Sequence, residues 1–478
     1  MSKKREGGQR KEAKLAVVIM AAGKGTRLKS RKPKVLHQVG GKTLLSHVIG
    51  AASKVVDGKD IFVVVGHEGG RVRDSVADSG VQFVEQREQR GTGHAIQAAL
   101  QSIGNYENVV VLSGDVPLIR WETIEGLWSF HRTHGAAMTF LTATLENPRG
   151  YGRIVRRGTG SAEVEAIVEQ VALAPEQESI REVNAGVYAF KTSALKGHVG
   201  ELNANNPQGE LYLTDMAGLL KAAGERVVAM QVENAAGVMG ANTLAELAAL
   251  DAKLRMATAS RLMANGVTIY RPETCVIDAD VEVEADAVIE PFAQLLGKTR
   301  IGASTLIRSY SVIENCTVGS RVIIRQSCVL ADSSVADGAD IGPFARMRPG
   351  CEIGEDVHIG NFVEVKKSKL HTGVKAGHLA YLGDAEIDAR TNIGAGVITC
   401  NYDGEQKHVT RIGKGVFVGS DSTLVAPVTI ADGAYIGAGS CITKDVPAGA
   451  LAVGRGRQVT KEGWANARRA RRKAREKG

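Results

Sequence analysis

Residues 277–313 read IDADVEVEADAVIEPFAQLLGKTRIGASTLIRSYSVI, and an aliphatic residue returns in this stretch at every sixth position. The same period recurs in two later runs. The repeat positions of the three runs are all apolar: Ile277, Val283, Ile289, Leu295, Ile301, Ile307 and Ile313; Val335, Ile341, Met347, Ile353, Ile359 and Val365; Ile412, Val418, Leu424, Ile430, Ile436 and Ile442. Only roughly a third of the residues of an average soluble protein are aliphatic, so chance does not explain the repeat.

A six-residue period fits short parallel strands wound into a coil, with one inward-facing residue on each side. Glycine often follows the inward residue, as in Ile301-Gly302 and Ile359-Gly360, which suggests tight corners. We therefore predict a three-sided prism of about eight or nine coils, ~40 Å long at the usual strand spacing. The pattern resembles the left-handed β-helix of the hexapeptide-repeat acyltransferases. The handedness rests on that resemblance, because ordinary crossovers are right-handed. A coil of this kind can also serve only to assemble subunits.

The chain has 478 residues, which predicts two domains of roughly 230 and 200 residues. No apolar run approaches the ~18 residues of a membrane span, and the polar start lacks the apolar segment of a signal peptide. The cysteines form no Cys-x-x-Cys pair, which argues against a zinc site or a disulfide framework. We therefore expect a soluble, cytoplasmic protein whose cysteines are mostly small apolar fillers of the coil: Cys275, Cys316, Cys328, Cys351, Cys400 and Cys441.

The net charge of +8 is concentrated at the two ends of the chain. Residues 1–14 carry six Lys/Arg against two Glu, and residues 461–478 carry eight against two, so the tails sum to +10 and the rest to −2. Basic tails can contact nucleic acid, but no aromatic-studded basic face or recognition motif accompanies them. We expect two solvated, mostly disordered tails and no nucleic-acid partner.

The amino-terminal half reads as a doubly wound, Rossmann-like α/β sheet. Leu15–Met20 is a continuous apolar run of the kind found in buried strands, and a glycine loop, Ala21-Ala22-Gly23-Lys24-Gly25, follows it. Such sheets bind ligands at the carboxyl ends of their strands, which is where this loop lies. The further elements predicted are the strands Ile61–Val65, Val109–Leu112 and Met138–Thr144 and the helices Leu44–Ala52 and His94–Ile103.

The glycine loop is neither a P-loop nor a dinucleotide fingerprint, since it lacks the lysine spacing of the first and the third glycine of the second. Alone it is weak evidence and could be a plain strand-to-helix turn. Arg27 and Lys34 follow it, however, and place cations near backbone N–H groups suited to phosphate oxygens.

An ordered set of further motifs follows the loop. Asp115 ends a buried strand, where a carboxylate that faces phosphates suits Mg²⁺, although a lone aspartate is more often a turn residue. The motifs are Gln86 with Gly91-Thr92-Gly93-His94, Ser113-Gly114-Asp115-Val116-Pro117, Gly150-Tyr151-Gly152-Arg153-Ile154, Ile167-Val168-Glu169, Val183-Asn184-Ala185-Gly186 and Glu210-Leu211-Tyr212-Leu213-Thr214-Asp215.

This set, joined to a hexapeptide coil, closely resembles the family of bifunctional N-acetylglucosamine-1-phosphate uridyltransferase/glucosamine-1-phosphate acetyltransferases. The resemblance covers about Leu15 to Trp464. It implies acetyl transfer from acetyl-CoA to glucosamine-1-phosphate, then Mg²⁺-dependent uridyl transfer from UTP to N-acetylglucosamine-1-phosphate. The product, UDP-N-acetylglucosamine, is a precursor for peptidoglycan and lipopolysaccharide.

The resemblance assigns the family's nucleotide and sugar contacts to particular residues of this chain. It implies a nucleotide loop at Met20, Ala21, Ala22 and Gly23, a phosphate-binding Lys34, uracil contacts from Gln86, Gly91 and Thr92, further contacts from Ser113 and Gly114, sugar contacts from Gly152, Glu169 and Asn184, and Mg²⁺ ligands at Asp115 and Asn242. One departure is Ser113, where a tyrosine is common in the family, and it puts only that contact in doubt.

A helix is predicted between the two halves. Thr243-Leu244-Ala245-Glu246 is a capping box, and Asn265-Gly266 supplies a stop, so we expect a helix of ~30 Å with its leucines largely on one stripe. The role of Asn242 as a metal ligand rests on the resemblance alone. The expected organisation is a basic extension over 1–14, the uridyltransferase domain over 15–241, the linker helix over 242–265, the acetyltransferase coil over 266–460 and a basic tail over 461–478.

The six-residue count breaks at about Lys366–Glu386 and Ile398–Arg411, and interruptions of a solenoid often carry function. Acetyl transfer to a sugar amine needs a base, for which histidine is suited near neutral pH. His378 is our candidate, since Gly-His-x-x-Tyr-x-Gly-Asp matches the family motif, although a lone loop histidine is usually structural. The resemblance also implies sugar-phosphate contacts from Arg348, Lys366, Tyr381, Asn392, Asn401 and Tyr402, and acetyl-CoA contacts from Ala395, Ser420, Ala438 and Arg455.

In related coils the acyl site lies between subunits, so the resemblance implies a homotrimer. Two other interpretations are open. One is a single-activity nucleotidyltransferase, such as an enzyme making ADP-glucose or GDP-mannose, whose coil only assembles subunits. The other is a catalytically inactive assembly protein. His378, Lys366 and the two breaks speak against a purely structural coil, which needs none of them.

Overall fold

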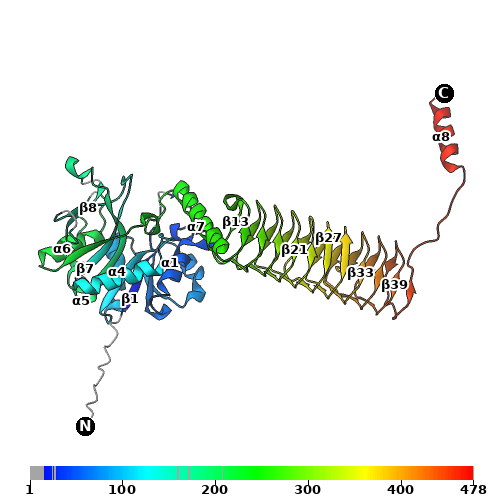
Figure 1. Ribbon diagram of the computed structural model, residues 1–478, viewed down its shortest axis with the longest axis horizontal. Coiled ribbons are helices and arrows are strands. Elements are labelled where there is room, and N and C mark those ends of the chain that lie inside the picture. Colours follow the sequence, from blue (N-terminus) through cyan, green and yellow to red (C-terminus); the bar gives the residue numbers. More distant parts are fainter. Residues whose placement is uncertain are drawn as a thin grey trace, which may run out of the picture. The chain divides into compact units, whose positions relative to one another are not determined.

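The computed structural model describes residues 15–23, 25, 28–158, 161–170, 173–206 and 208–476. It forms two compact units that meet in sequence between Arg255 and Met256 (Figure 1). This division falls within helix α7, Leu244–Ala264, where we expected the linker. The expected basic extension over 1–14 lies outside the described residues.

The first unit is built on a mixed sheet whose strands lie in the order β11-β7-β10-β6-β1-β4-β5. Strand β10 runs antiparallel to both of its neighbours, whereas β1 is parallel to β4 and β6. The strands are β1 Leu15–Met20, β4 Ile61–Val65, β5 Gln82–Glu85, β6 Asn108–Ser113, β7 Met138–Thr144, β10 Glu182–Lys191 and β11 Val227–Gln231, with β8 Arg153–Arg156 and β9 Val164–Val168 pairing beside β10 and the small hairpin β2 Gln38–Val39 and β3 Lys42–Thr43 forming a separate sheet.

Helices cover both faces of this sheet (Figure 1). Ala16 and Val18 of β1 belong to one core cluster and Val17 and Ile19 to the other, which explains why the strand is apolar at every position. The first cluster includes residues of α3 Thr92–Ile103, α5 Thr192–His198 and α6 Met216–Ala222, and the second includes residues of α1 Leu44–Ala52, α2 Gly69–Asp74 and α4 Trp121–His134. The predicted doubly wound fold is confirmed.

The second unit is a left-handed β-helix of three parallel sheets. Sheet I contains β12 Thr268–Ile269, β15 Val288–Ile289, β18 Leu306–Ile307, β21 Ile323–Ile324, β24 Asp340–Ile341, β27 His358–Asn361, β30 Lys375–His378, β33 Asn392–Ile393, β36 Phe417–Val418, β39 Tyr435–Ile436 and β41 Leu451–Ala452. Sheet II contains β13 Val276–Ile277, β16 Gln294–Leu296, β19 Val312–Glu314, β22 Val329–Ala331, β25 Arg346–Met347, β28 Glu364–Lys366, β31 Tyr381–Gly383, β34 Ile398–Cys400, β37 Thr423–Val425 and β40 Cys441–Ile442. Sheet III contains β14 Glu282–Val283, β17 Arg300–Ile301, β20 Thr317–Val318, β23 Ser334–Val335, β26 Glu352–Ile353, β29 Lys369–Leu370, β32 Ala385–Ile387, β35 Thr410–Ile412 and β38 Val428–Ile430.

The coil is longer than predicted, because two of its three sheets have 11 and 10 strands, more than the eight or nine coils expected. The predicted break at Lys366–Glu386 is wrong. Sheets I to III continue through it, and the sequence slips out of phase because two sides are five residues long, from Val365 to Leu370 and from Leu382 to Ile387. The second predicted break is an outward excursion, since the chain leaves the coil after β34 and rejoins it at β35.

Gly302 and Gly360, two glycines that follow inward residues, serve coil stacking and not the turn, whereas Gly342 has φ +100. Gly302 and Gly360 do not adopt the left-handed backbone region, but a Cβ on Gly360 would lie 1.8 Å from the carbonyl oxygen of Gly377 in the next coil. The left-handed conformations at the corners belong to other residues, such as Phe292 and Ser304. Glycine is therefore required at these positions because adjacent coils approach closely.

Helix α7 begins as predicted. The Thr243 hydroxyl accepts a hydrogen bond from Glu246 N at 3.1 Å, and the Glu246 carboxylate accepts one from Asn242 N at 2.6 Å. The expected leucine stripe is only partly found, because Leu250 and Leu262 are buried whereas Leu244 is exposed. Each buried leucine packs with the unit to which it belongs.

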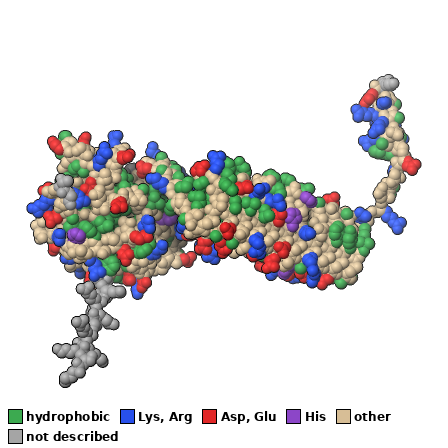
Figure 2. All heavy atoms as spheres, in the orientation of Figure 1, with side chains coloured by type: hydrophobic (Ala, Val, Ile, Leu, Met, Phe, Trp, Pro, Cys, Tyr) green, Lys and Arg blue, Asp and Glu red, His purple; other side chains and the backbone are tan. Residues whose placement is uncertain are grey.

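The carboxyl-terminal tail differs from our expectation of a mostly disordered segment. Residues Trp464–Arg475 form the helix α8, and all its side chains are exposed. Many of them are Lys and Arg (Figure 2). Alanine and arginine are strong helix formers, which explains a helix without packing partners among the described residues. Four of the six cysteines, all free, are buried as predicted. Among the residues described, no helix is long and apolar enough to cross a membrane.

Candidate functional sites

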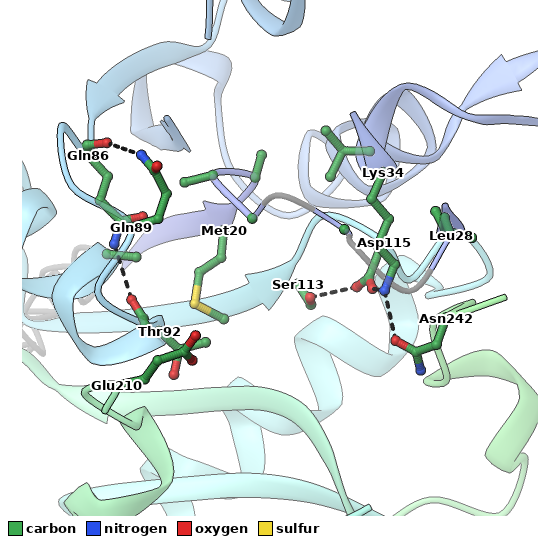
Figure 3. Close-up of a pocket in the computed structure, with 17 residues that line it drawn as sticks. Met20, Leu28, Lys34, Gln86, Gln89, Thr92, Ser113, Asp115, Glu210 and Asn242 are labelled. Atoms are coloured by element: carbon green, nitrogen blue, oxygen red, sulfur yellow. Dashed lines mark hydrogen bonds and ion pairs between the residues drawn. The ribbon is translucent and has the colours of Figure 1, made fainter. Parts of the chain in front are cut away.

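A cavity of about 520 Å³ opens at the carboxyl ends of β1 and β6 in the first unit (Figure 3). Most of the residues predicted to contact the nucleotide line it: Met20, Ala21, Ala22, Gly23, Lys34, Gln86, Gly91, Thr92, Ser113, Asp115 and Asn242. Arg27 lies outside the described residues. Gly114 lies behind the cavity wall, where its N–H donates to the Met20 carbonyl at 2.9 Å. The sequence therefore brings together, from four separate segments, the residues that the motifs singled out.

One corner of this cavity holds a cluster of four polar side chains. The Lys34 ammonium forms an ion pair with Asp115 and donates a hydrogen bond to Asn242 Oδ1 at 3.0 Å (Figure 3). The Ser113 hydroxyl donates to Asp115 Oδ1 at 2.6 Å, so the serine that departs from the family pattern orients this carboxylate. Both oxygens, from Asp115 and Asn242, point at one cation.

This oxygen pair fits Mg²⁺. The ion takes only one or two protein oxygens when phosphate and water complete its shell, and the Lys34 ammonium stands where such a cation would bind. Within the described residues no group of three or more His, Cys, Asp or Glu side chains is arranged to hold a metal. A metal shared with a phosphate ligand suits the Asp115 and Asn242 oxygens.

The opposite end of the cavity is shaped by amides and backbone. Gln86 Nε2 donates to the Gly91 carbonyl at 3.1 Å, and Gln89 Nε2 donates to the Gln86 carbonyl at 3.0 Å. Gly91 has φ +105, a conformation that favours glycine, and a Cβ there would lie 2.6 Å from the Leu211 carbonyl oxygen. The Thr92 hydroxyl accepts from Leu213 N at 2.9 Å. Amide groups held in this way can read the edge of a base.

The three residues predicted to hold the sugar lie close to one another, and Glu169 contacts Thr214, whose neighbour Leu213 donates to the cavity-lining Thr92. Asn184 N donates to the Gly152 carbonyl at 3.0 Å, and a Cβ on Gly152 would lie 3.4 Å from Glu169 Oε1. Burial raises the pKa of Glu169, with a hydrogen bond from Thr214 at 3.4 Å opposing the shift. Asn184 Nδ2 also donates to the Tyr188 hydroxyl at 2.8 Å. A half-buried carboxylate with an amide beside it suits sugar hydroxyl groups.

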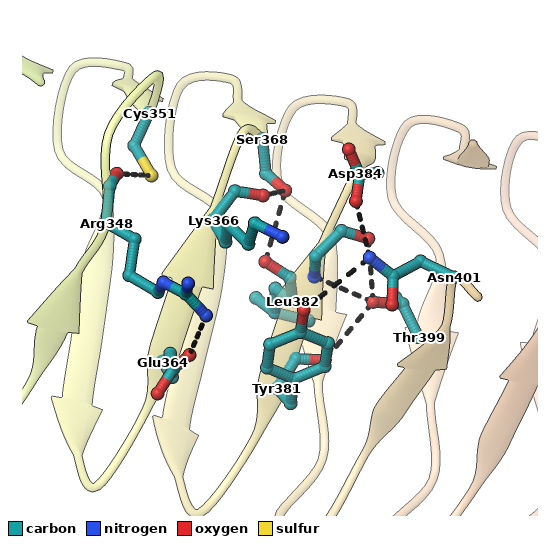
Figure 4. A network of polar contacts seen from close by, with 11 residues as sticks. Arg348, Cys351, Glu364, Lys366, Ser368, Tyr381, Leu382, Asp384, Thr399 and Asn401 are labelled. Carbon is teal, nitrogen blue, oxygen red and sulfur yellow. Dashed lines mark hydrogen bonds and ion pairs between the residues drawn. The ribbon is translucent and has the colours of Figure 1, made fainter. Parts of the chain in front are cut away.

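In the second unit, four of the predicted residues follow one another along sheet II (Figure 4). Arg348 follows β25 and lies 3.2 Å from the Glu364 carboxylate. Lys366 ends β28, Tyr381 begins β31, and Asn401 follows β34. Asn401 Nδ2 contacts Asp384 Oδ2 and lies 3.5 Å from the Tyr381 hydroxyl. Successive coils thus present two cations and two uncharged polar groups on one side of the prism.

His378 lies at the end of β30 on sheet I, at the corner that leads to β31. Its Nδ1 lies 2.7 Å from Asn361 Oδ1, one coil earlier in the same sheet, and its side chain is exposed. Asn392 lies on β33 of sheet I, so the structure does not bring it into the sheet II row. With Nδ1–H donated to Asn361, the Nε2 lone pair is available as a base.

The predicted acetyl-CoA residues are stacked along the corner after sheet I. Asp421 N donates to the Ala395 carbonyl at 2.8 Å, and Gly439 N donates to the Ser420 carbonyl at 2.7 Å. Arg455 Nη1 donates to the Ala438 carbonyl at 2.7 Å. The result is a continuous edge of small residues that ends at a guanidinium group.

Comparison with known proteins identifies the family. Residues 17–188 match the MobA-like NTP transferase domain, residues 271–370 match the GMPPB C-terminal domain, and residues 410–444 match the bacterial transferase hexapeptide of six repeats. The chain is 56% identical to the bifunctional protein GlmU of Koribacter versatilis over 461 residues, which covers 96% of this chain and 98% of that protein. It is 48% identical to GlmU of Solibacter usitatus, covering 95% and 97%, and 44% identical to GlmU of Streptococcus agalactiae, covering 94% and 97%. The chain belongs to the bifunctional GlmU family.

The resemblance drawn from the sequence is therefore confirmed. The chain is a bifunctional enzyme with UDP-N-acetylglucosamine diphosphorylase and glucosamine-1-phosphate N-acetyltransferase activities. The single-activity interpretation is not favoured, because GlmU relatives match both halves of the chain.

The structure adds residues that the GlmU motifs alone did not single out. Gln89 and Glu210 line the cavity, and Thr214 and Tyr188 contact the sugar-side residues. Glu210 and Thr214 fall within a motif that we quoted but gave no role. On the coil, Lys407 lies beside Lys366, whose ammonium lowers the pKa of Lys407. No spacing signal links Lys407 to Lys366, because the contact depends on how the excursion after β34 folds back.

Proposed function

We propose that the two GlmU activities lie on separate units, with uridyl transfer over residues 15–241 and acetyl transfer on the coil over 266–460. The reaction order is acetylation of glucosamine-1-phosphate followed by uridylation of the acetylated sugar phosphate. The convergence of Lys34, Asp115 and Asn242 at one corner of the cavity carries the first assignment. The row of Arg348 and Lys366 along sheet II carries the second.

In uridyl transfer an oxygen of the sugar phosphate attacks the α-phosphate of UTP, and pyrophosphate leaves. Met20 to Gly23 and Lys34 hold the phosphates, while Gln86, Gly91 and Thr92 contact the uracil. Gly152, Glu169 and Asn184 hold the sugar, which suits their closeness to one another. Mg²⁺, when held by Asp115 and Asn242, offsets the charge that develops on the phosphates.

In acetyl transfer the amine nitrogen of glucosamine-1-phosphate attacks the thioester carbonyl of acetyl-CoA. His378 takes the amine proton at Nε2 while Asn361 holds the ring through Nδ1, and the CoA thiolate leaves. Arg348 and Lys366 neutralise the sugar phosphate, with Lys407 as a third cation beside them. The predicted sugar contacts are Tyr381, Asn392, Asn401 and Tyr402, and the predicted acetyl-CoA contacts are Ala395, Ser420, Ala438 and Arg455.

We further propose that the coil assembles as a homotrimer. One corner of the prism exposes a row of large apolar side chains, and Figure 2 displays green patches on the visible face of this unit. Phe292 stacks on Tyr310 with ring centroids 5.1 Å apart, and Phe344 stacks on Phe362 at 5.4 Å. These rings are 42% to 61% exposed, and exposed apolar patches of this kind mark subunit interfaces. His378 lies near the same corner, so a second copy can complete its site. A cytoplasmic location is in keeping with the free cysteines.

Two assays on one variant test the assignment of activities to units. Asp115→Ala should abolish formation of UDP-N-acetylglucosamine from UTP and N-acetylglucosamine-1-phosphate. Its release of CoA from acetyl-CoA and glucosamine-1-phosphate should remain at the wild-type rate. Near wild-type uridyl transfer in Asp115→Ala would show that the metal assignment is wrong. Sedimentation of the full chain as a monomer that still acetylates would contradict the shared acetyl site.

A further inference from the structure

The excursion between β34 and β35 forms a small hairpin over residues 401–409. Tyr402 and Lys407 pair as an antiparallel bridge across it, and His408 N donates to the Asn401 carbonyl at 2.8 Å. The foot of the hairpin is fixed to the coil, because Asn401 is 7% exposed and its amide contacts Asp384. Asp384 N in turn donates to the Lys366 carbonyl at 3.0 Å. The hairpin therefore rises directly beside Lys366.

One carboxylate organises the turn of this hairpin. Asp403 Oδ1 accepts hydrogen bonds from Glu405 N at 2.8 Å and Gln406 N at 2.7 Å. Asp403 Oδ2 lies 2.6 Å from Nε2 of His408 on the returning arm. The backbone N–H of Gln406, together with the contacts from His408 and Glu405, holds the pKa of Asp403 well below its usual range. A permanently ionised carboxylate thus ties the turn to the return strand.

The contact between His408 and Asp403 opposes a repulsion within the same structure. Lys407 precedes His408, and the Lys366 ammonium lies close enough to lower the pKa of Lys407. Two like charges at short range push the hairpin away from the coil. The hairpin's tip is exposed and lacks a buried core. Lys407 is held by the bridge to Tyr402, the backbone hydrogen bond from His408 N to Asn401 and the His408–Asp403 contact, and only the last of these depends on the His408 side chain.

We propose that His408 is a positioning residue for acetyl transfer: through Asp403 it fixes the hairpin so that Lys407 stays beside Lys366 as a two-ammonium site for the sugar phosphate. This inference rests on the proposed role of Lys366. His408 touches neither the reacting amine nor the thioester in this scheme, so its effect falls on the binding of glucosamine-1-phosphate and not on the chemical step.

The test compares His408→Phe, which keeps a flat ring but has no nitrogen, with His408→Gln, which keeps a donor. His408→Phe should raise the KM for glucosamine-1-phosphate by about fivefold, the scale expected for one lost hydrogen bond. The kcat of acetyl transfer, the KM for acetyl-CoA and uridyl transfer should be unchanged. His408→Gln should recover part of the loss. His371→Phe is the matched control, because His371 lies 3.9 Å from Glu386 on a different sheet and should change none of these values.

A double-mutant cycle with Asp403→Asn separates loss of the His408–Asp403 contact, which we call the latch, from general damage to the fold. If the two residues act through each other, the double variant should have the same KM as the single variants. Additive effects, or an unchanged KM in His408→Phe, would overturn the proposal. Lys366→Met distinguishes failure of the proposed phosphate site from failure of the proposed role of His408. An unchanged KM for glucosamine-1-phosphate in Lys366→Met refutes the phosphate site. A raised KM in Lys366→Met with no effect of His408→Phe refutes only the role of His408.

Discussion

Lys34 and Asp115 form an ion pair whose side chains are only 16% and 18% exposed, and the lysine ammonium also reaches Asn242 Oδ1 at 3.0 Å. The two oxygens proposed to hold Mg²⁺ therefore already contact a cation that belongs to the protein. A divalent ion cannot share this position with the ammonium, since like charges repel at such distances. Asp115 and Asn242 would hold the metal only if the Lys34 ammonium left them, for instance to contact the phosphates of a bound nucleotide.

Removing the ammonium should therefore tighten metal binding to the nucleotide-free enzyme. For Lys34→Met we expect Mn²⁺ to bind about tenfold or more tightly than to the wild type, because Asp115 loses its competing partner. The bound fraction can be measured from the electron paramagnetic resonance signal of free Mn²⁺. Asp115→Asn should bind no Mn²⁺ at this site in either background. Equal Mn²⁺ affinities of Lys34→Met and wild type would contradict the competition.

His378→Ala should slow acetyl transfer without weakening substrate binding. General base catalysis typically contributes ~10² to 10⁴-fold, so kcat should fall by that order while the KM for glucosamine-1-phosphate changes little. Higher pH should partly rescue the variant, because more of the amine is then already deprotonated. Steady-state measurement of CoA release from pH 6 to 9 checks both points, and uridyl transfer is the internal control. An unchanged kcat would mean that the proton leaves by another route.

A buried histidine in the first unit predicts a loss of stability in mild acid. His131 is 1% exposed and its Nδ1 lies 2.8 Å from the Thr139 hydroxyl, and burial lowers its pKa from 6.5 to about 4. Between these values His131 is protonated in the unfolded chain but not in the folded chain. The free energy of unfolding therefore decreases as pH falls from 6.5 toward 4. The loss is at most roughly 1.4 kcal/mol per pH unit.

Urea unfolding at pH 7 and pH 5 measures this effect. His131→Gln carries no titrating ring, so its stability should fall less between the two pH values than that of the wild type. An identical pH dependence in both proteins would rule out His131 as the cause.

Two coil glycines, Gly360 and Gly377, provide a matched pair of substitutions that tests how closely adjacent coils pack. Gly360→Ala would place a Cβ 1.8 Å from the Gly377 carbonyl oxygen, whereas a Cβ on Gly377 meets nothing within 4 Å. Overpacking of this kind typically costs 1–3 kcal/mol, so Gly360→Ala should lower the thermal midpoint of the coil while Gly377→Ala should leave it nearly unchanged. Circular dichroism melting of the full chain distinguishes the two, and equal melting curves would show that neighbouring coils can separate at no cost.

The sequence predicted those parts of the fold that leave a local periodic signal. Leu15–Met20 and Met138–Thr144 were predicted to the residue, because the first is apolar throughout and the second combines apolar residues with β-branched threonine, a residue common in strands. The number of coils was underestimated, and the break at Lys366–Glu386 was wrong, because a side of five residues disturbs the period without interrupting the sheets. The helix α8 was missed, since a charged segment without packing partners has no apolar pattern to detect.

The site residues were predicted in so far as they lie in motifs. Lys34, Asp115 and Asn242 come from separate segments, and their convergence could be inferred only from the family resemblance. The latch between Asp403 and His408 and the approach of Lys407 to Lys366 depend on how one hairpin folds over its neighbours. Contacts of this kind leave no spacing rule in the sequence.

The five- and six-residue sides also bear on how the coil can change in evolution. In an ordinary strand a shift of one residue turns every later side chain to the opposite face. Here Val365 and Leu370 are five residues apart, Ala376 follows after six, and all three still point inward. Each corner thus resets the count, so that an insertion or deletion stays confined to the corner where it occurs. The excursion at residues 401–409 is a larger insertion of the same kind, since the coil continues on both sides of it. New loops with new specificities can thus be added at a corner while the stacked coils are preserved.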